Sequence, residues 1–201
     1  YFVGPYISAA MVWLGNLVNV NVAKYPILGG IAVSVLMGII LTLPISSAAI
    51  GVSMGITGLA AGAATIGCCC NMVGFAVASY RDNKVNGLLA QGLGTSMLQI
   101  GNIVKKPVIW LPAIITSAIL GPVSTMVFKM TNNATGSGMG TAGLVGPLMT
   151  YQVMSETVAP AIVLAEIIVM YFVLPAVISL GVSEFMRKKG WIKYGDMQLD
   201  Q

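Results

Sequence analysis

The chain has 201 residues, of which ten are Lys or Arg and six are Asp or Glu, and it contains no His. A soluble domain carries roughly 25% charged residues, whereas this chain has 8%, and 57% of its residues are hydrophobic. These values exclude a soluble enzyme, a disordered tail and a disulfide-rich secreted module, and they exclude chemistry that needs His as a base or metal ligand. We therefore expect an integral membrane protein, with no cofactor, no bound metal and no nucleic-acid partner.

The N-terminal segment is apolar from its first residue. Because neither a basic segment nor a cleavage site accompanies Tyr1, we expect the chain to be the C-terminal part of a longer protein. Within it, residues 1–201 are predicted to form a single membrane domain. Tyr6–Val22 is a weak candidate for a span, because three Asn residues crowd its end.

Four further stretches are apolar enough for transmembrane helices. They are Ile27–Leu43, part of Gly58–Tyr80, Val108–Phe128 and Val158–Val182. Their apolar residues are continuous, whereas the strands of a membrane barrel alternate polar and apolar residues. We therefore predict an all-α, polytopic membrane protein of about five to six transmembrane helices, with Gly-rich re-entrant or broken-helix segments between them.

Gly87–Val104 is another weak candidate, because Gln, Ser, Thr and Asn side chains make it polar for lipid. It could lie at the interface, enter the membrane and return, or span it while buried among other helices. Three small residues, Cys68, Cys69 and Cys70, lie inside an apolar run, where they are predicted to pack as small apolar side chains rather than bind metal.

Basic residues predict the orientation of the spans. The clusters are Lys24; Arg81 with Lys84; Lys105 with Lys106; and Arg187, Lys188, Lys189 and Lys193. The last cluster places the C-terminus, a tail of residues 186–201, in the cytoplasm. With all clusters on that side, Ile27–Leu43 and the following span run in opposite directions, and Gly87–Val104 starts and finishes on one side.

Two Gly-rich segments are the most informative for function. Thr131–Gly143 holds too many amides, hydroxyls and glycines for a lipid-facing helix, and Ser46–Gly58 echoes it. Non-helical backbone survives at membrane depth only inside protein or beside a water-filled cavity. We expect the two segments to approach each other near mid-membrane and to bind a neutral polyhydroxylated ligand, although Thr131–Gly143 could instead be a flexible external loop.

Acidic residues extend this hypothesis. Glu156 follows the second Gly-rich segment and could contact a ligand or proton, or be solvated at the interface, and Glu166 could hydrogen-bond a neighbouring helix. The candidate substrate-binding residues are Ser46, Ser47, Asn132, Asn133, Thr135, Ser137 and Glu156. No catalytic residue is predicted. If the cavity lies elsewhere, Gln91, Ser96 and Gln99 are the next candidates.

An internal repeat is predicted at an offset of about 85 residues. Met11–Pro26 aligns with Met97–Pro112, and Met54–Leu59 aligns with Met139–Leu144. The units are about 1–86 and about 87–185. Repeated units with a substrate site between them are common in secondary transporters.

The chain resembles a known family over nearly its whole length. The similarity is carried by Gly92–Met97, Asn102–Val104, Leu120–Thr125 and Asn132–Gly146, and also by Leu43–Ala49 and Ala61–Cys70. These stretches are similar to membrane subunits of the phosphotransferase system, enzyme IIC type, and most to the branch that includes perfringolysin O regulator-like proteins. The His that other branches use at the sugar is absent.

The resemblance implies a subunit that binds a sugar and carries it inward across a bacterial inner membrane, while cytoplasmic IIA and IIB subunits supply the phosphoryl group. It implies partners besides the bilayer: a sugar or other small polar ligand, IIA and IIB, and a second copy in a homodimer or other homo-oligomer. Two alternatives stay open. One is a membrane sensor or regulator of gene expression that binds a small ligand, and the other is an ion-coupled carrier or channel.

Overall fold

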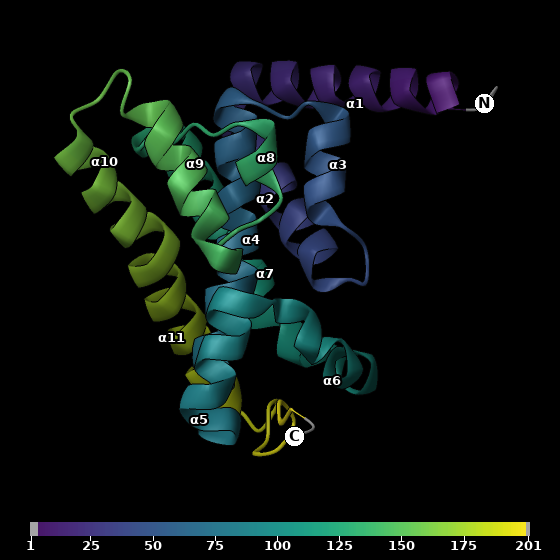
Figure 1. Ribbon diagram of the computed structural model, residues 1–201. Helices are drawn as coiled ribbons and strands as arrows, with labels where there is room; N and C mark the ends of the chain where they lie inside the picture. The colour runs from purple at the N-terminus through teal and green to yellow at the C-terminus, as the bar shows by residue number, and fades with distance from the viewer. Residues whose placement is uncertain (1–3, 200–201) are drawn as a thin grey trace.

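The computed structural model describes residues 4–199, and their secondary structure is helical (Figure 1). The α-helices are α1 (Gly4–Lys24), α2 (Pro26–Thr42), α3 (Ser47–Met54), α4 (Gly58–Ala78), α5 (Tyr80–Leu89), α6 (Ile100–Lys105), α7 (Leu111–Pro122), α8 (Ala134–Ser137), α9 (Val145–Met154), α10 (Pro160–Ile167) and α11 (Leu174–Lys188). This confirms the prediction of an all-helical fold. The end of the predicted tail, residues 200–201, lies outside the described residues.

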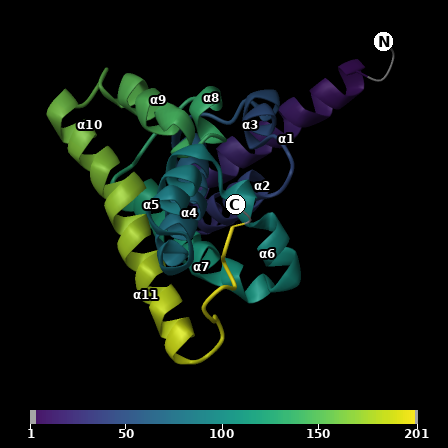
Figure 2. The same cartoon turned by 60° about the horizontal axis from the view of Figure 1, so that its bottom comes forward.

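Four helical stretches are long and apolar enough to cross a membrane. They are α1, α4, α7 with its flanking turns (Pro107–Val127), and α10 continued into α11 (Pro160–Lys188). Helix α2 is also apolar but has only 17 residues. These elements confirm the predicted apolar segments, and the weak N-terminal candidate is among them. Helix α1 projects sideways from the bundle (Figures 1 and 2).

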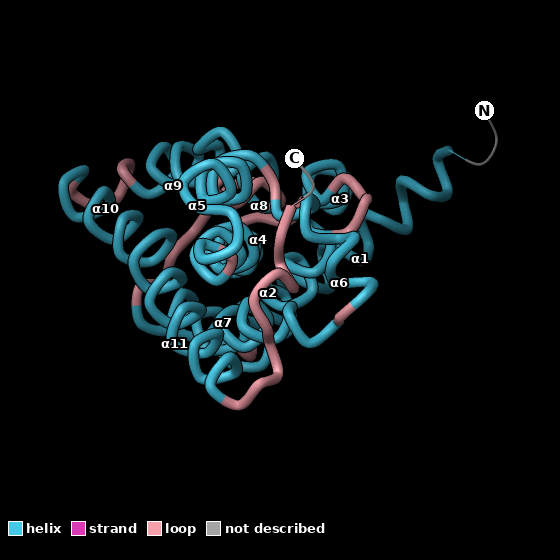
Figure 3. Tube along the Cα trace, turned by 90° about the horizontal axis from the view of Figure 1, so that it is seen from below, coloured by secondary structure: helices cyan, strands magenta, loops and turns pink. Residues whose placement is uncertain are grey.

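Helix α4 is the centre of the bundle, and α2, α7 and α11 pack around it (Figure 3). It consists largely of Gly, Ala and Cys, and almost all of its residues are buried, including the three adjacent cysteines predicted to pack there. Small side chains let helices approach closely, and this close packing stabilises helix association where lipid provides no hydrophobic driving force.

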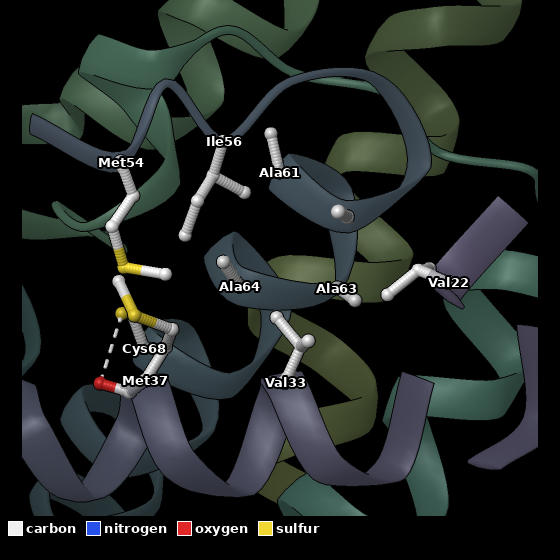
Figure 4. Close-up of a cluster of buried hydrophobic side chains, with 10 residues drawn as sticks. Val22, Val33, Met37, Met54, Ile56, Ala61, Ala63, Ala64 and Cys68 are labelled. Atoms are coloured by element: carbon white, nitrogen blue, oxygen red, sulfur yellow. Dashed lines mark hydrogen bonds between the residues drawn. The ribbon is translucent and has the colours of Figure 1, made fainter. Parts of the chain in front are cut away.

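The contact between α2 and α4 depends on a glycine. A Cβ atom on Gly67 would lie 1.8 Å from the carbonyl oxygen of Ser34, so a larger residue does not fit there. Beside it, the thiol of Cys68 donates to the carbonyl oxygen of Met37, 3.5 Å away. Figure 4 shows Met37 and Val33 of α2 facing the small residues of α4.

Helices α2 and α4 run in the same direction. Ser34, at the middle of α2, lies against Gly67 of α4, while Thr42 at the end of α2 donates to the amide oxygen of Asn71, further along α4. Helix α3 returns the chain between them. Helix α7 is antiparallel to both, because the hydroxyl of Thr125 beyond its end donates to the carbonyl oxygen of Pro26 at the start of α2.

The prediction that Ile27–Leu43 and the span within Gly58–Tyr80 run in opposite directions is therefore wrong, and Lys24 lies at the opposite end of the bundle from Arg81. The physical reason is α3. Its eight residues are too few to cross a bilayer, which takes about 20, so hydropathy does not count it as a span. It nevertheless reverses the chain.

The two ends of the bundle differ in charge. Helices α4 and α11 finish at the end where α5, α6 and the C-terminal residues lie (Figures 1 and 2). We call this the basic end. Its basic residues are Arg81, Lys84, Lys105, Lys106, Arg187, Lys188, Lys189 and Lys193. The opposite end carries Lys24, Lys129 and Glu156.

Residues 80–105 enter the bundle and return. After α5, a π-helical turn (Ala90–Gly94) and a 3-10 turn (Ser96–Gln99) form the inner tip, and α6 leads back. At the tip, the hydroxyl of Thr141 donates to the carbonyl oxygen of Gly92. Both limbs of this segment hydrogen-bond the C-terminal residues, Asn83 of α5 at Met197 and Asn102 of α6 at Gln198. This confirms the prediction that Gly87–Val104 starts and finishes on one side.

Candidate functional site

The two Gly-rich segments meet beside the start of α4. Gly58 and Asn132 form an antiparallel bridge, with N–H to O distances of 3.0 and 3.2 Å. The buried hydroxyl of Ser47 at the start of α3 donates to the carbonyl oxygen of Gly138, 2.6 Å away, just beyond α8. The prediction that the segments approach each other is thus confirmed, while their depth in the membrane stays a prediction.

Glycine permits this close approach from both sides. A Cβ atom on Gly51 of α3 would lie 2.2 Å from the hydroxyl oxygen of Ser137, and one on Gly138 would lie 2.2 Å from the carbonyl oxygen of Ser47. Each segment therefore places a glycine against a serine of the other. We call these residues and Asn132 the crossing site; its members are Ser47, Gly51, Asn132, Ser137 and Gly138.

Local hydrogen bonds start both short helices. The hydroxyl of Ser46 accepts from the N–H of Ala49 at 3.2 Å, and the side chain of Asn133 accepts from the N–H of Gly136 at 2.9 Å. Ser and Asn are preferred at this position because their oxygens satisfy N–H groups that have no partner within the first turn. Both residues therefore have a structural role, whatever else they bind.

Asn132 is the most thoroughly bonded residue of the crossing site. Its amide nitrogen donates to the hydroxyl of Thr65 at 2.8 Å and to the carbonyl oxygen of Gly146 at 3.2 Å, while its amide oxygen accepts from the N–H of Asn133 at 2.8 Å. With 1% of its surface exposed, Asn132 ties α4, α8 and α9 together.

The structure separates the predicted binding residues into three groups. Ser47, Asn132, Asn133 and Ser137 come together at or beside the crossing site. Ser46 and Thr135 are exposed at its rim. Glu156 is exposed in the turn between α9 and α10, and within residues 4–199 no hydrogen bond or ion pair joins it to the crossing site. Ligand binding by these residues stays a prediction.

Sequence reasoning missed most of a second polar set, which is centred on Asn71 and of which it named only Ser96. Its amide oxygen accepts from the hydroxyl of Thr42 at 3.3 Å and from the indole N–H of Trp110 at 2.9 Å. Its nitrogen donates to Ser117 at 3.4 Å, and Thr42 shares a 2.8 Å hydrogen bond with Ser96. We call these five residues the polar layer.

One signal could have found the polar layer: Asn71 is the only amide side chain in the long apolar stretch Gly58–Tyr80. A buried amide in such a stretch needs partners, because an unpaired one costs about 1–3 kcal/mol. Gln91, Ser96 and Gln99, predicted as the second place to look, are all fully buried near this layer or between it and the basic end.

The groups of the crossing site are neutral and polar. They are an amide, hydroxyls and peptide groups that can both donate and accept hydrogen bonds. In this structure these groups bond one another, so a ligand would have to replace protein partners with its own hydroxyls.

Comparison with known proteins identifies a family. The family model described as "Phosphotransferase system, EIIC" matches residues 1–199, nearly the whole chain. It does not distinguish the perfringolysin O regulator-like branch, which stays a prediction. No curated protein and no solved structure matches the chain.

Proposed function

Because the chain belongs to the phosphotransferase system EIIC family, we propose that it is the sugar-binding and translocating membrane subunit of such a system. Its partners would be cytoplasmic IIA and IIB subunits and a second copy of itself. The observation that supports a binding role is the crossing site, where two Gly-rich segments place buried amide and hydroxyl groups beside the central helix.

The hydrogen bonds of the crossing site suggest how a sugar would be bound. Ser47 and Asn132 are bonded to carbonyl and hydroxyl groups of neighbouring elements. A sugar hydroxyl both donates and accepts, so it can take over such bonds without leaving a buried group unpaired. Binding would then separate α3 from α8, and this movement is the step we propose for translocation.

The distribution of charge supports an orientation. Lys and Arg are enriched in cytoplasmic loops close to spans, and the basic end holds most of those in this chain. We propose that the basic end faces the cytoplasm, where it would meet IIA and IIB.

A duplication would account for the paired short helices. At an offset of about 85 residues, α3 corresponds to the segment that contains α8. We propose that repeats of about 1–86 and 87–185 each contribute one Gly-rich segment, so that the site lies at their interface, as in many transporters.

The test is a matched pair of variants at Asn133. We expect Asn133→Ala and Asn133→Ser both to weaken sugar binding, because both remove the amide. Only Asn133→Ala also removes the helix cap, at a cost of about 0.5–2 kcal/mol in stability. Thermal stabilisation of the detergent-solubilised protein by a panel of sugars and polyols measures both effects, since a ligand selective for the folded state stabilises it.

Normal sugar-dependent stabilisation and uptake in Asn133→Ser would contradict a binding role for this amide. The same panel separates the alternatives. A sensor or regulator would bind a sugar without taking it up. An ion-coupled carrier would be stabilised by Na⁺ or show a pH dependence that Glu156→Gln removes.

A further inference from the structure

The C-terminal residues 190–199 are packed as part of the fold. After α11 the chain turns back and passes between α5 and α6 (Figures 2 and 3), and hydrogen bonds join it to both. Two of its side chains are buried, Ile192 with 2% and Met197 with 0% of its surface exposed, in a cluster with Phe75, Ile103 and Met186. We call residues 190–199 the strap.

Side-chain amides hold the strap by its backbone. Asn83 of α5 donates to the carbonyl oxygen of Met197 at 2.8 Å and accepts from the N–H of Leu199 at 2.8 Å. From the other limb, Gln99 donates to the same Met197 oxygen at 2.9 Å, and Asn102 donates to the carbonyl oxygen of Gln198 at 2.8 Å. Both limbs of the segment 80–105 are thus joined through the strap.

Charged groups add to this attachment. The carboxylate of Asp82, fully buried, pairs with Arg187 at 3.0 Å and accepts from the strap N–H of Gly195 at 2.9 Å. The carboxylate of Asp196 in the strap pairs with Lys106 beside α6. The pair of Asp82 with Arg187 is buried, and removing one partner of such a pair is costly, because the remaining charge has no partner.

The amide bonds continue inward from the strap. Gln99 donates to the amide oxygen of Gln91 at 2.9 Å, and Gln91 donates at 2.8 Å to the hydroxyl of Ser79, which follows the end of α4. Ser96, on the same inner tip, shares a hydrogen bond with Thr42 of the polar layer. The strap therefore fixes the segment whose tip closes the polar layer towards the basic end.

We propose that the strap is a latch: while bound, it holds residues 80–105 inserted, and its release opens the polar layer to water from the basic end. Backbone hydrogen bonds suit a reversible contact, since the backbone of another segment could replace them. Two aromatic side chains of the strap are exposed and could bind a partner: Trp191, with 54% of its surface exposed, and Tyr194, with 76%. The contacts of the strap are the same whichever solute is carried.

The test uses the full chain in detergent with a reporter thiol, Ser96→Cys. Ser96 and the three native cysteines are fully buried, so we expect slow alkylation by a water-soluble maleimide. Adding Asn83→Ala removes two strap bonds and should raise the alkylation rate about tenfold or more. The matched control is Asn86→Ala, since Asn86 lies exposed on the same helix.

A second arm avoids any folding defect of the variant. A specific protease site inserted after the exposed Lys189 lets the strap be cut in the folded protein. Faster alkylation of Ser96→Cys after the cut supports the latch. If the reporter stays protected after complete cleavage, or if Asn83→Ala and Asn86→Ala behave alike, the proposal is overturned.

Discussion

At the scale of single residues, the charge of Asp196 affects the stability of the strap. Burial raises the pKa of this carboxyl, but hydrogen bonds from Lys106 and from the N–H of Lys193, with the charges of both lysines, lower the pKa to a net value below its ordinary 3.8. The charged form therefore stabilises the folded strap at higher pH, and this contribution is lost as pH falls through the lowered pKa.

We accordingly expect the protection of the Leu199 amide from hydrogen exchange to fall once the pH drops below about 4, where the unfolded carboxyl begins to protonate. Asp196→Asn should lower protection at neutral pH and remove most of the dependence. Protection that changes with pH equally in both proteins would assign the effect to another group.

Part of the candidate site could be predicted from single residues of the sequence. The density of amides and hydroxyls around Asn132 and Ser47 indicates the segments that meet. It does not indicate their partners, because Thr65 and Gly146 become neighbours only through helix packing. The sequence favours Glu156 for its nearness along the chain, yet this residue lies exposed in the turn before α10.

At the scale of elements, glycine decides how closely helices pack. Gly67→Ala would place a methyl group 1.8 Å from a backbone oxygen of α2, whereas a Cβ atom on Gly181 of α11 would meet nothing within 4 Å. We expect Gly67→Ala to separate α2 from α4 and to lower the melting temperature in detergent. Gly181→Ala should be neutral or stabilising by up to about 1 kcal/mol, since Ala is the better helix former.

If Gly67→Ala melts like the wild type, or if Gly181→Ala lowers the melting temperature as much as Gly67→Ala, the packing of α2 on α4 is not as described. Each variant is the control for the other, because both exchange one glycine for alanine within a helix.

Hydropathy predicted the elements but not their directions. Long apolar runs in the sequence predict α4, α7 and α10 with α11, because a helix that crosses a bilayer needs about 20 apolar residues. Helix α3 has eight residues and α8 has four. Neither length gives a span-like signal, so the parallel course of α2 and α4 could not be inferred. Short helices of this kind depend on neighbouring segments for part of their hydrogen bonding. Which segments are neighbours is known only once the fold is known.

At the scale of the whole molecule, the basic end predicts the orientation. A Cys introduced at the exposed Gln198 should react with an impermeant thiol reagent only after the membrane is opened, because Lys and Arg mark the cytoplasmic side. The matched position is Thr157, exposed at the opposite end, where a Cys should react in intact cells. If instead the Cys at 198 reacts in intact cells and the Cys at 157 does not, the basic end faces outward and the proposed orientation is wrong.

The parallel course of α2, α4 and α11 has an electrostatic consequence. Each helix carries about half a positive elementary charge at its start and half a negative one at its finish, so three aligned helices add their dipoles while α7 opposes them. The guanidinium of Arg187 donates at 3.0 Å to the carbonyl oxygen of Ala78, where α4 finishes. The lysines of that end complement the same negative pole. At the other end Glu156 is outnumbered by Lys24 and Lys129, which leaves the positive pole little offset, so a cation arriving there would be repelled and a neutral sugar would not.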